Sequence, residues 1–344
     1  MESGPTKADL LSLSPEELAD LLEGSGRAKQ VWVLLRQGKD PIGSEGLGKK
    51  ARALFVERCR LEIPKVRRRQ QGACGTSKFL LELSDGLLIE SVFIPGPARN
   101  TLCVSTQVGC ARACAFCATG TMGLLRQLSA GEIVAQVHWV ERELADQGRG
   151  PVSNLVFMGM GEPLDNFEAV EKSITILSHP LTYGMASRRM TLSTIGPSPE
   201  AIARCAGLPI NLAWSLHAAD DTLRAQLIPK LRYTNIEIRD AFAKVLAGRR
   251  SSLFVEMALM DGVNDGLEHA DQLMALFSDM RDRVRTNLLP MNPGPGDFQP
   301  SPPERVEAFR KHLQDHGYFC ETRKARGRDI QAACGQLAIR PESP

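Results

Sequence analysis

The sequence predicts an α/β protein whose parallel sheet is curved into a full or partial barrel. From residue 102 onward, apolar runs with strand character alternate with helical patterns, which is typical of a parallel sheet covered by helices. With 344 residues, of which 43% are hydrophobic, the chain has material for about two domains. The six apolar runs are residues 102–106, 155–158, 190–194, 210–216, 254–259 and 286–289.

A small helical domain is expected over residues 1–75. Ser14, Pro15 and Glu17 mark a helix start, with a hydroxyl cap, a proline in the first turn and a carboxylate three positions after the cap. Basic side chains are in excess in this part, and the excess lies in Arg58, Arg60, Lys65, Arg67, Arg68 and Arg69. Such a run is most often a solvated surface, and the sharper alternative is a phosphate-binding surface.

Residues 76–98 are expected to form a hairpin that links the two domains. Segments 77–84 and 87–94 have strand character, and Asp85-Gly86 lies between them. This dipeptide suits both central positions of a type I′ turn, the tight turn that joins antiparallel strands.

The barrel is expected over residues 99–338, followed by a tail at 339–344. Ser129 and Glu132 form a capping box at the start of the first barrel helix. Catalytic groups of such sheets lie beyond the carboxyl ends of the strands, and the unusual polar residues of this chain closely follow the apolar runs.

Composition excludes several classes of protein. The formal charge is only +2, which argues against a uniformly basic RNA coat. No apolar run approaches the ~18 residues that span a bilayer, and the N-terminus lacks a signal-peptide pattern. Nine cysteines are an odd number and too few for a disulfide scaffold. We therefore expect a cytoplasmic protein without membrane contact.

Cys110, Cys114 and Cys117 form a CxxxCxxC pattern in a loop after the first apolar run. Structural zinc and ferredoxin-type clusters take four protein ligands, and no fourth Cys or His lies near this loop. Three thiolates on a [4Fe–4S] cluster leave one iron open, which is useful only when an exchangeable ligand binds there.

The CxxxCxxC pattern, with Phe116 directly before its third cysteine, resembles the signature of the radical S-adenosylmethionine superfamily. In that superfamily the methionine part of S-adenosylmethionine binds the open iron. The glycine-rich turn 159–163 follows an apolar run and contains Glu162, whose carboxylate suits the ammonium group of that cofactor. One [4Fe–4S] cluster per chain and S-adenosylmethionine are the expected cofactors.

Two further segments narrow the resemblance. TLCVSTQVGC at 101–110 and RGRDIQAACGQL at 326–337 resemble the RlmN/Cfr family of radical S-adenosylmethionine RNA methyltransferases, and the likeness extends over essentially the whole chain to Leu337. The resemblance implies a partial (βα)6 radical-SAM barrel behind a small N-terminal helical domain. It also implies that residues 1–75 help to dock RNA.

The resemblance also implies roles for single residues. Cys334 would carry the methyl group, Cys103 would resolve the adduct, and Glu90 would accept a proton. The implied cluster ligands are Cys110, Cys114 and Cys117. The implied S-adenosylmethionine contacts are Gly161, Glu162, Ser193, Ser215, Leu216, His217 and Asn292.

The implied reaction suits an adenine ring carbon, which is too inert to take a methyl group directly. One S-adenosylmethionine would methylate Cys334, and a second would yield a radical that abstracts hydrogen from that methyl group. The resulting carbon radical would add to adenine, and after loss of one electron and one proton Cys103 would attack Cys334, releasing the methylated base and leaving a disulfide between the two cysteines.

Three functions remain open. Methylation of C2 of an adenosine in 23S rRNA, with tRNA as a second substrate, is the first. Methylation of C8, as in Cfr-type antibiotic resistance, is the second. The segments CATG at 117–120 and STIG at 193–196 fit both the C2 and the C8 enzymes of the family, whereas residues 90–95 favour C2. The third is a non-catalytic iron–sulfur RNA-binding protein, against which the pair Cys103 and Cys334 argues. A monomer that receives electrons from a flavodoxin or ferredoxin is expected.

Overall fold

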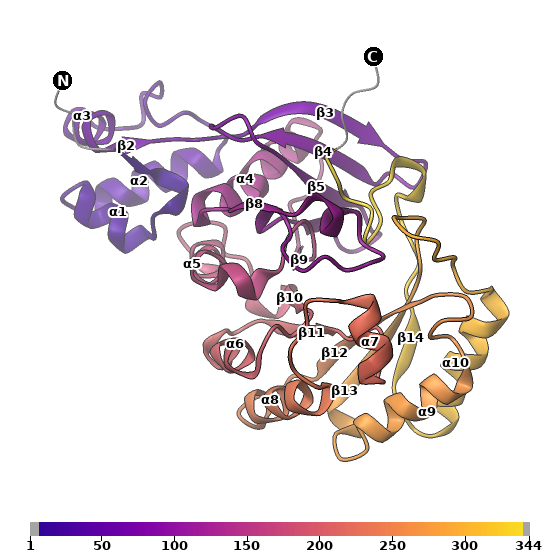
Figure 1. The fold of residues 1–344 in the computed structure, drawn as a ribbon. Coiled ribbons are helices and arrows are strands. Elements are labelled where there is room, and N and C mark those ends of the chain that lie inside the picture. The colour runs from indigo at the N-terminus through magenta and orange to yellow at the C-terminus, as the bar shows by residue number, and fades with distance from the viewer. Residues whose placement is uncertain (1–6, 340–344) are drawn as a thin grey trace.

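The computed structural model describes residues 7–339, so most of the expected tail lies outside the described part (Figure 1). A ten-stranded sheet dominates it, in the order β14-β13-β12-β11-β10-β9-β6-β5-β4-β3. Neighbouring strands from β6 to β14 are parallel, which gives the α/β architecture that the sequence predicts. These strands are β6 (Thr101–Cys103), β9 (Asn154–Phe157), β10 (Met190–Thr194), β11 (Asn211–Ser215), β12 (Leu253–Leu259), β13 (Val284–Pro290) and β14 (Cys320–Thr322).

The six apolar runs correspond to β6 and β9–β13, although β6 ends at Cys103 rather than at Thr106. The seventh parallel strand, β14, was not predicted. It has three residues, of which Glu321 and Thr322 are exposed, so it carries no apolar pattern that a sequence could reveal.

Helices connect the parallel strands, and most of them lie along the outer side of the curved sheet (Figure 1). Buried apolar side chains of strands and helices form the main core between them, and a smaller cluster that includes Leu227 packs against Cys114 and Phe116. The capping box predicted for the first of these helices is present, with Ser129 Oγ accepting from Glu132 N at 3.1 Å. The helices are α4 (Ala130–Asp146), α5 (Phe167–Ser178), α6 (Pro199–Arg204), α7 (Asp221–Leu227), α8 (Asn235–Ala247), α9 (Leu267–Leu276) and α10 (Pro303–Asp315).

Three antiparallel strands extend the sheet beyond β6: β3 (Lys65–Gln71), β4 (Ser77–Glu82) and β5 (Leu88–Ile94). The predicted hairpin is β4–β5, but its turn is not type I′. Gly86 has a φ of +84°, whereas Asp85 is not among the residues with positive φ. The loop instead spans three residues, with Gly86 N donating to Leu83 O at 3.0 Å. The boundary expected at residue 75 falls between β3 and β4, which are hydrogen-bonded neighbours.

The N-terminal part contains α1 (Pro15–Leu21), α2 (Ser25–Arg36) and α3 (Lys49–Arg58), with β1 (Ala8–Asp9) paired to β2 (Cys59–Arg60). The capping box predicted at Ser14 and Glu17 is present. Ser12 Oγ accepts from Gly131 N at 2.9 Å and so fixes this part to the start of α4. None of the helices described for residues 7–339 is long and apolar enough to cross a membrane.

Candidate active site

The sheet gathers the sequence-predicted residues at one end of its parallel strands. Cys103 is the last residue of β6, and Ser215 the last of β11. The turn with Gly161 and Glu162 follows β9, and Asn292 follows β13. Because parallel strands end at the same edge, residues as far apart in the chain as Cys103 and Asn292 lie around one site.

The three predicted cluster cysteines lie on a loop between two short antiparallel strands, β7 (Gln107–Gly109) and β8 (Leu124–Gln127). Cys110 N donates to Gly123 O at 2.8 Å, which closes the loop at its base. Ala113 has a φ of +55°, a conformation that costs energy for a residue with a Cβ. The loop is therefore held in a strained form between Cys110 and Cys114.

Burial raises the pKa of the Cys110 thiol to about 12 and raises that of Cys114 as well. Neighbouring thiols and Glu162 add to both shifts, so Cys110 and Cys114 could not both be thiolates here without a compensating positive charge. Among residues 7–339, no three His, Cys, Asp or Glu side chains converge on one point suited to a single metal ion. A cubane presents a separate iron to each thiolate, so its ligands need not converge, and the loop fits a [4Fe–4S] cluster.

An ion pair fixes the middle of the cysteine loop. Arg112 lies between the first two cysteines, and its Nε donates to Asp165 Oδ2 at 2.7 Å. Asp165 follows the glycine-rich turn, and its carbonyl accepts from Gln127 Nε2 of β8 at 2.7 Å. Loop, turn and β8 thus form one connected unit, which sequence spacing alone did not predict.

The glycine-rich turn approaches β7, the strand before the cysteine loop, closely. Gly161 has a φ of +105°, and a Cβ there would lie 2.6 Å from the Gln107 side chain. Glu162 N donates to Gln107 Oε1 at 2.8 Å, while its carboxylate accepts from Leu164 N and Ile195 N, each at 3.0 Å. Desolvation raises the pKa of Glu162 to about 7. An approaching ammonium group would favour its ionised form.

Ser193 and Ser215 face each other from neighbouring strands, with 3.0 Å between their hydroxyl oxygens. Leu216 is fully buried; its N donates to Trp214 O at 2.9 Å, and its carbonyl accepts from Arg224 Nε at 2.9 Å. His217 has a φ of +62°, its Nδ1 accepts from Ala258 N at 3.0 Å, and its ring packs edge-on against Phe116. Burial lowers the pKa of His217 to about 3, so the ring is neutral.

The C-terminal segment with Cys334 crosses the site and touches the cysteine loop. Ala118 N donates to Gly335 O at 2.7 Å, and Thr119 Oγ1 donates to Leu337 O at 2.6 Å. From the other side, Asn292 Nδ2 donates to Cys334 O at 3.1 Å. Cys334 is thereby placed between the cysteine loop and the end of β13.

Cys103 and Cys334 are separate free thiols, so the disulfide expected between them is absent from this structure. Burial, followed by the neighbouring Cys334, raises the pKa of Cys103. Cys334 is exposed, but the protein around it, with Glu256 as the leading charged neighbour, raises its pKa to about 11. Both residues are therefore protonated thiols at neutral pH.

Glu90 lies buried on β5, and its Oε2 accepts from Ala338 N at 3.0 Å. Its Oε1 is 2.9 Å from Nζ of Lys78, which is buried on β4. Lys78 was missed at the sequence level, although a lysine followed by Phe79, Leu80 and Leu81 in a predicted strand was a usable signal. Glu256 on β12 was also missed; it is buried and accepts from Asn287 Nδ2 at 2.8 Å.

Comparison with known proteins places the chain in a family. Residues 104–274 match the Radical SAM superfamily. The RlmN dual-specificity RNA methyltransferase of Francisella tularensis subsp. novicida is 38% identical over 345 residues, covering 96% of this chain and 93% of that protein. A probable RNA methyltransferase of Sorangium cellulosum is 46% identical over 265 residues, or 76% of this chain and 66% of its own length, just under two thirds.

A solved structure agrees with these matches. The radical SAM methyltransferase of Sphaerobacter thermophilus superimposes with a TM-score of 0.90 at 38% identity, covering 96% of this chain and 99% of that one. Radical SAM proteins use a [4Fe–4S] cluster and S-adenosylmethionine, and these are the cofactors of this enzyme. The chain belongs to the RlmN/Cfr family of radical S-adenosylmethionine RNA methyltransferases.

Proposed function

We propose that this enzyme methylates C2 of an adenosine in 23S rRNA, with tRNA as a second substrate, through a methyl group carried on Cys334. One observation carries the proposal: the Cys334 segment is hydrogen-bonded on both sides of the site. Its Gly335 carbonyl accepts from Ala118 N of the cysteine loop, and its Ala338 N donates to the Glu90 carboxylate. A methyl group on Cys334 would therefore lie between the proposed radical source and the proposed base.

The proposed roles follow from these positions. Cys110, Cys114 and Cys117 hold the cluster, which with S-adenosylmethionine supplies a methyl group and a hydrogen-abstracting radical when bound. Once the radical adduct has lost one electron, Glu90 takes the proton from the adenine carbon, and Cys103 then attacks Cys334, which releases the product and leaves a Cys103–Cys334 disulfide. The groups proposed to hold S-adenosylmethionine are Gly161, Glu162, Ser193, Ser215, Leu216, His217 and Asn292.

Both Ser193 and Ser215 offer hydroxyls, and Glu162 offers a carboxylate, which suits a cofactor with a ribose and an ammonium group. The backbone of Leu216 and the neutral ring of His217 border the same end of β11. We further propose RNA as the macromolecular partner, a flavodoxin or ferredoxin as electron donor, and a monomer acting in the cytoplasm.

Replacing Cys103 with Ala tests the proposed chemistry. The reaction should then stop after carbon–carbon bond formation, leaving the RNA covalently attached to Cys334. A denaturing gel with and without ribonuclease, followed by peptide mass analysis, detects the adduct. Cys74→Ala, which removes an exposed thiol, is the matched control and should leave no adduct.

A Cys103→Ala enzyme that turns over normally, or an adduct on another residue, would reject the methyl-cysteine route. The methylated carbon is identified by nucleoside mass analysis of 23S rRNA and tRNA from cells with and without the gene. Loss of 2-methyladenosine supports the proposal, loss of 8-methyladenosine assigns the C8 reaction, and no change favours a non-catalytic protein.

A further inference from the structure

Lys78, Val92 and Cys103 lie in one row across three neighbouring strands. The register pairs Lys78 with Val92 and Val92 with Cys103. Directly paired residues project from the same face of a sheet, and strands two places apart, such as β4 and β6, are separated by about 10 Å. Lys78 therefore shares the inner face of the sheet with Cys103.

Lys78 and Glu90 together contact both ends of the segment that contains Cys334. Lys78 Nζ donates to Gln331 O at 3.2 Å, three residues before Cys334. Glu90 Oε2 accepts from Ala338 N at 3.0 Å, four residues after it. The two side chains are joined by their own ion pair at 2.9 Å, with only 7% and 6% of their surfaces exposed.

Stability alone gives little reason for such a pair. Moving an ammonium and a carboxylate out of water costs several kcal/mol per ion, and an apolar pair of similar volume is often as stable or more so. The Lys78–Glu90 pair is distinguished by its further bonds to residues 331 and 338, which tie the C-terminal segment to the strands next to Cys103.

We propose that Lys78 is a positioning residue that orients the Glu90 carboxylate and, through Gln331, holds Cys334 within reach of Cys103. This inference rests on the proposed function, in which Cys103 and Cys334 form a disulfide when the product leaves. Lys78 touches neither reacting sulfur; it acts through Glu90 and through the backbone of residues 331–338.

The test measures how readily the two thiols pair in the absence of RNA. Cluster-loaded protein is equilibrated anaerobically with mixtures of reduced and oxidised glutathione, and the Cys103–Cys334 disulfide is counted by peptide mass analysis. Formation of this disulfide removes two electrons and two protons from the thiols and converts one glutathione disulfide into two glutathione thiols. Chains with a methylated Cys334 are scored separately in the same digest.

Lys78→Met should lower the equilibrium constant for the disulfide at least about tenfold, because the freed segment lowers the effective concentration of Cys334 at Cys103. Lys78→Arg retains a cation and should recover to within about threefold of the wild type. Lys172→Met is the matched control, since Lys172 pairs with Glu17 at 2.8 Å on the exposed surface, and it should change nothing.

A double-mutant cycle tests whether Lys78 and Glu90 position Cys334 together or whether each substitution loosens the C-terminal segment independently. Glu90→Gln should also lower the equilibrium constant, and Lys78→Met with Glu90→Gln should lower it no further than Lys78→Met alone, because the two residues act as one clamp. Additive effects, or a folded Lys78→Met protein with wild-type pairing, would overturn the inference. If Lys78→Met cannot be purified, Glu90→Gln tests the clamp from its other end, and wild-type pairing in that variant rejects it.

The result also distinguishes this inference from the proposed function. Wild-type protein that forms no disulfide at any glutathione ratio would remove the resolving step, so both would fall. A disulfide that forms equally well with and without Lys78 would reject the positioning role alone and leave the proposed function intact.

Discussion

At the scale of single residues, burial decides which groups carry charge near the site. Desolvation raises the pKa of Glu162 to about 7 and lowers that of His217 to about 3. Both groups are therefore biased toward their neutral forms without a ligand. A cationic cofactor group at Glu162 would reverse that bias, whereas the Arg224 guanidinium near His217 strengthens it.

The same physics acts on Glu141, which lies on α4 away from the site and accepts from Val152 N at 3.0 Å. Burial raises its pKa from 4.5 to about 7. The folded protein therefore holds this proton more tightly than the unfolded chain, so stability falls as the pH rises from 4.5 to 7. Glu141→Gln should remove this loss and raise the free energy of unfolding at about pH 8 by ~1–3 kcal/mol.

Urea unfolding at about pH 5 and about pH 8 measures this effect, and the gain should be confined to the higher pH. Glu171→Gln on the exposed surface of α5 serves as the control and should show no such difference. A Glu141→Gln protein with the wild-type pH dependence would show that Glu141 is solvated in solution.

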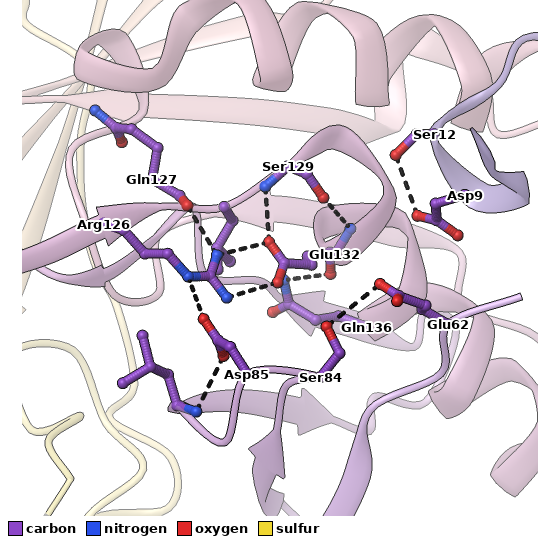
Figure 2. A network of polar contacts seen from close by, with 12 residues as sticks. Asp9, Ser12, Glu62, Ser84, Asp85, Arg126, Gln127, Ser129, Glu132 and Gln136 are labelled. Carbon is purple, nitrogen blue, oxygen red and sulfur yellow. Dashed lines mark hydrogen bonds and ion pairs between the residues drawn. The ribbon is translucent and has the colours of Figure 1, made fainter. Parts of the chain in front are cut away.

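At the scale of elements, Arg126 joins β8 and the neighbouring start of α4 to the β4–β5 turn, which is 41 positions away in the sequence (Figure 2). From β8, its Nε donates to Asp85 Oδ2 in the β4–β5 turn at 2.7 Å. Its two terminal nitrogens donate to Glu132 of α4 at 2.9 and 2.8 Å. Glu132 also caps α4, because its carboxylate accepts from Ser129 N. The Arg126 guanidinium therefore ties β8, which follows the cysteine loop, to the β4–β5 hairpin and to α4.

Replacing Arg126 with Met should lower the free energy of unfolding by about 1–3 kcal/mol, because the partly buried Glu132 and the exposed Asp85 both lose their charged donor. Arg310→Met is the control: Arg310 also pairs with a carboxylate, Glu307, but within a single exposed helix, where such a pair contributes ~0.5 kcal/mol or less. Denaturant unfolding gives both values. Equal costs for the two variants would mean that the three-way contact adds nothing.

At the scale of the whole molecule, local patterns predicted the elements but not the contacts between distant segments. The periodicity of apolar residues gave the six parallel strands, and the capping residues at Ser14 and Ser129 gave two helix starts. The clamp from Lys78 to Gln331 spans 253 positions and leaves no local trace. The prediction of a type I′ turn at Asp85 was wrong because Asp-Gly suits more than one loop length. The loop length that forms depends on how the two strands twist in the sheet.

The distribution of charge over the whole molecule bears on RNA binding. The basic run, for which phosphate binding was the alternative to a solvated surface, is largely paired with carboxylates: Arg58 with Glu23, Arg60 with Glu62, Arg67 with Glu82, and Arg69 with Glu143. By contrast, Arg323 and Lys324 are exposed between β14 and the Cys334 segment, and none of the ion pairs described within residues 7–339 includes them. A paired arginine already has a counter-ion, so it releases fewer ions when it meets a phosphate.

Neutralising the two sets should therefore affect RNA binding differently. Replacing Arg323 and Lys324 with Gln should lower the slope of log affinity against log salt by about 0.7 for each phosphate that the protein no longer neutralises. Replacing Arg67 and Arg69 with Gln should lower the slope by less per charge, because arginines that are paired with Glu82 and Glu143 neutralise fewer phosphates. Binding isotherms between about 50 and 200 mM salt measure both slopes. A larger decrease in slope from the arginine pair would place the phosphate path on β3, and the segment before Cys334 would then only support the site.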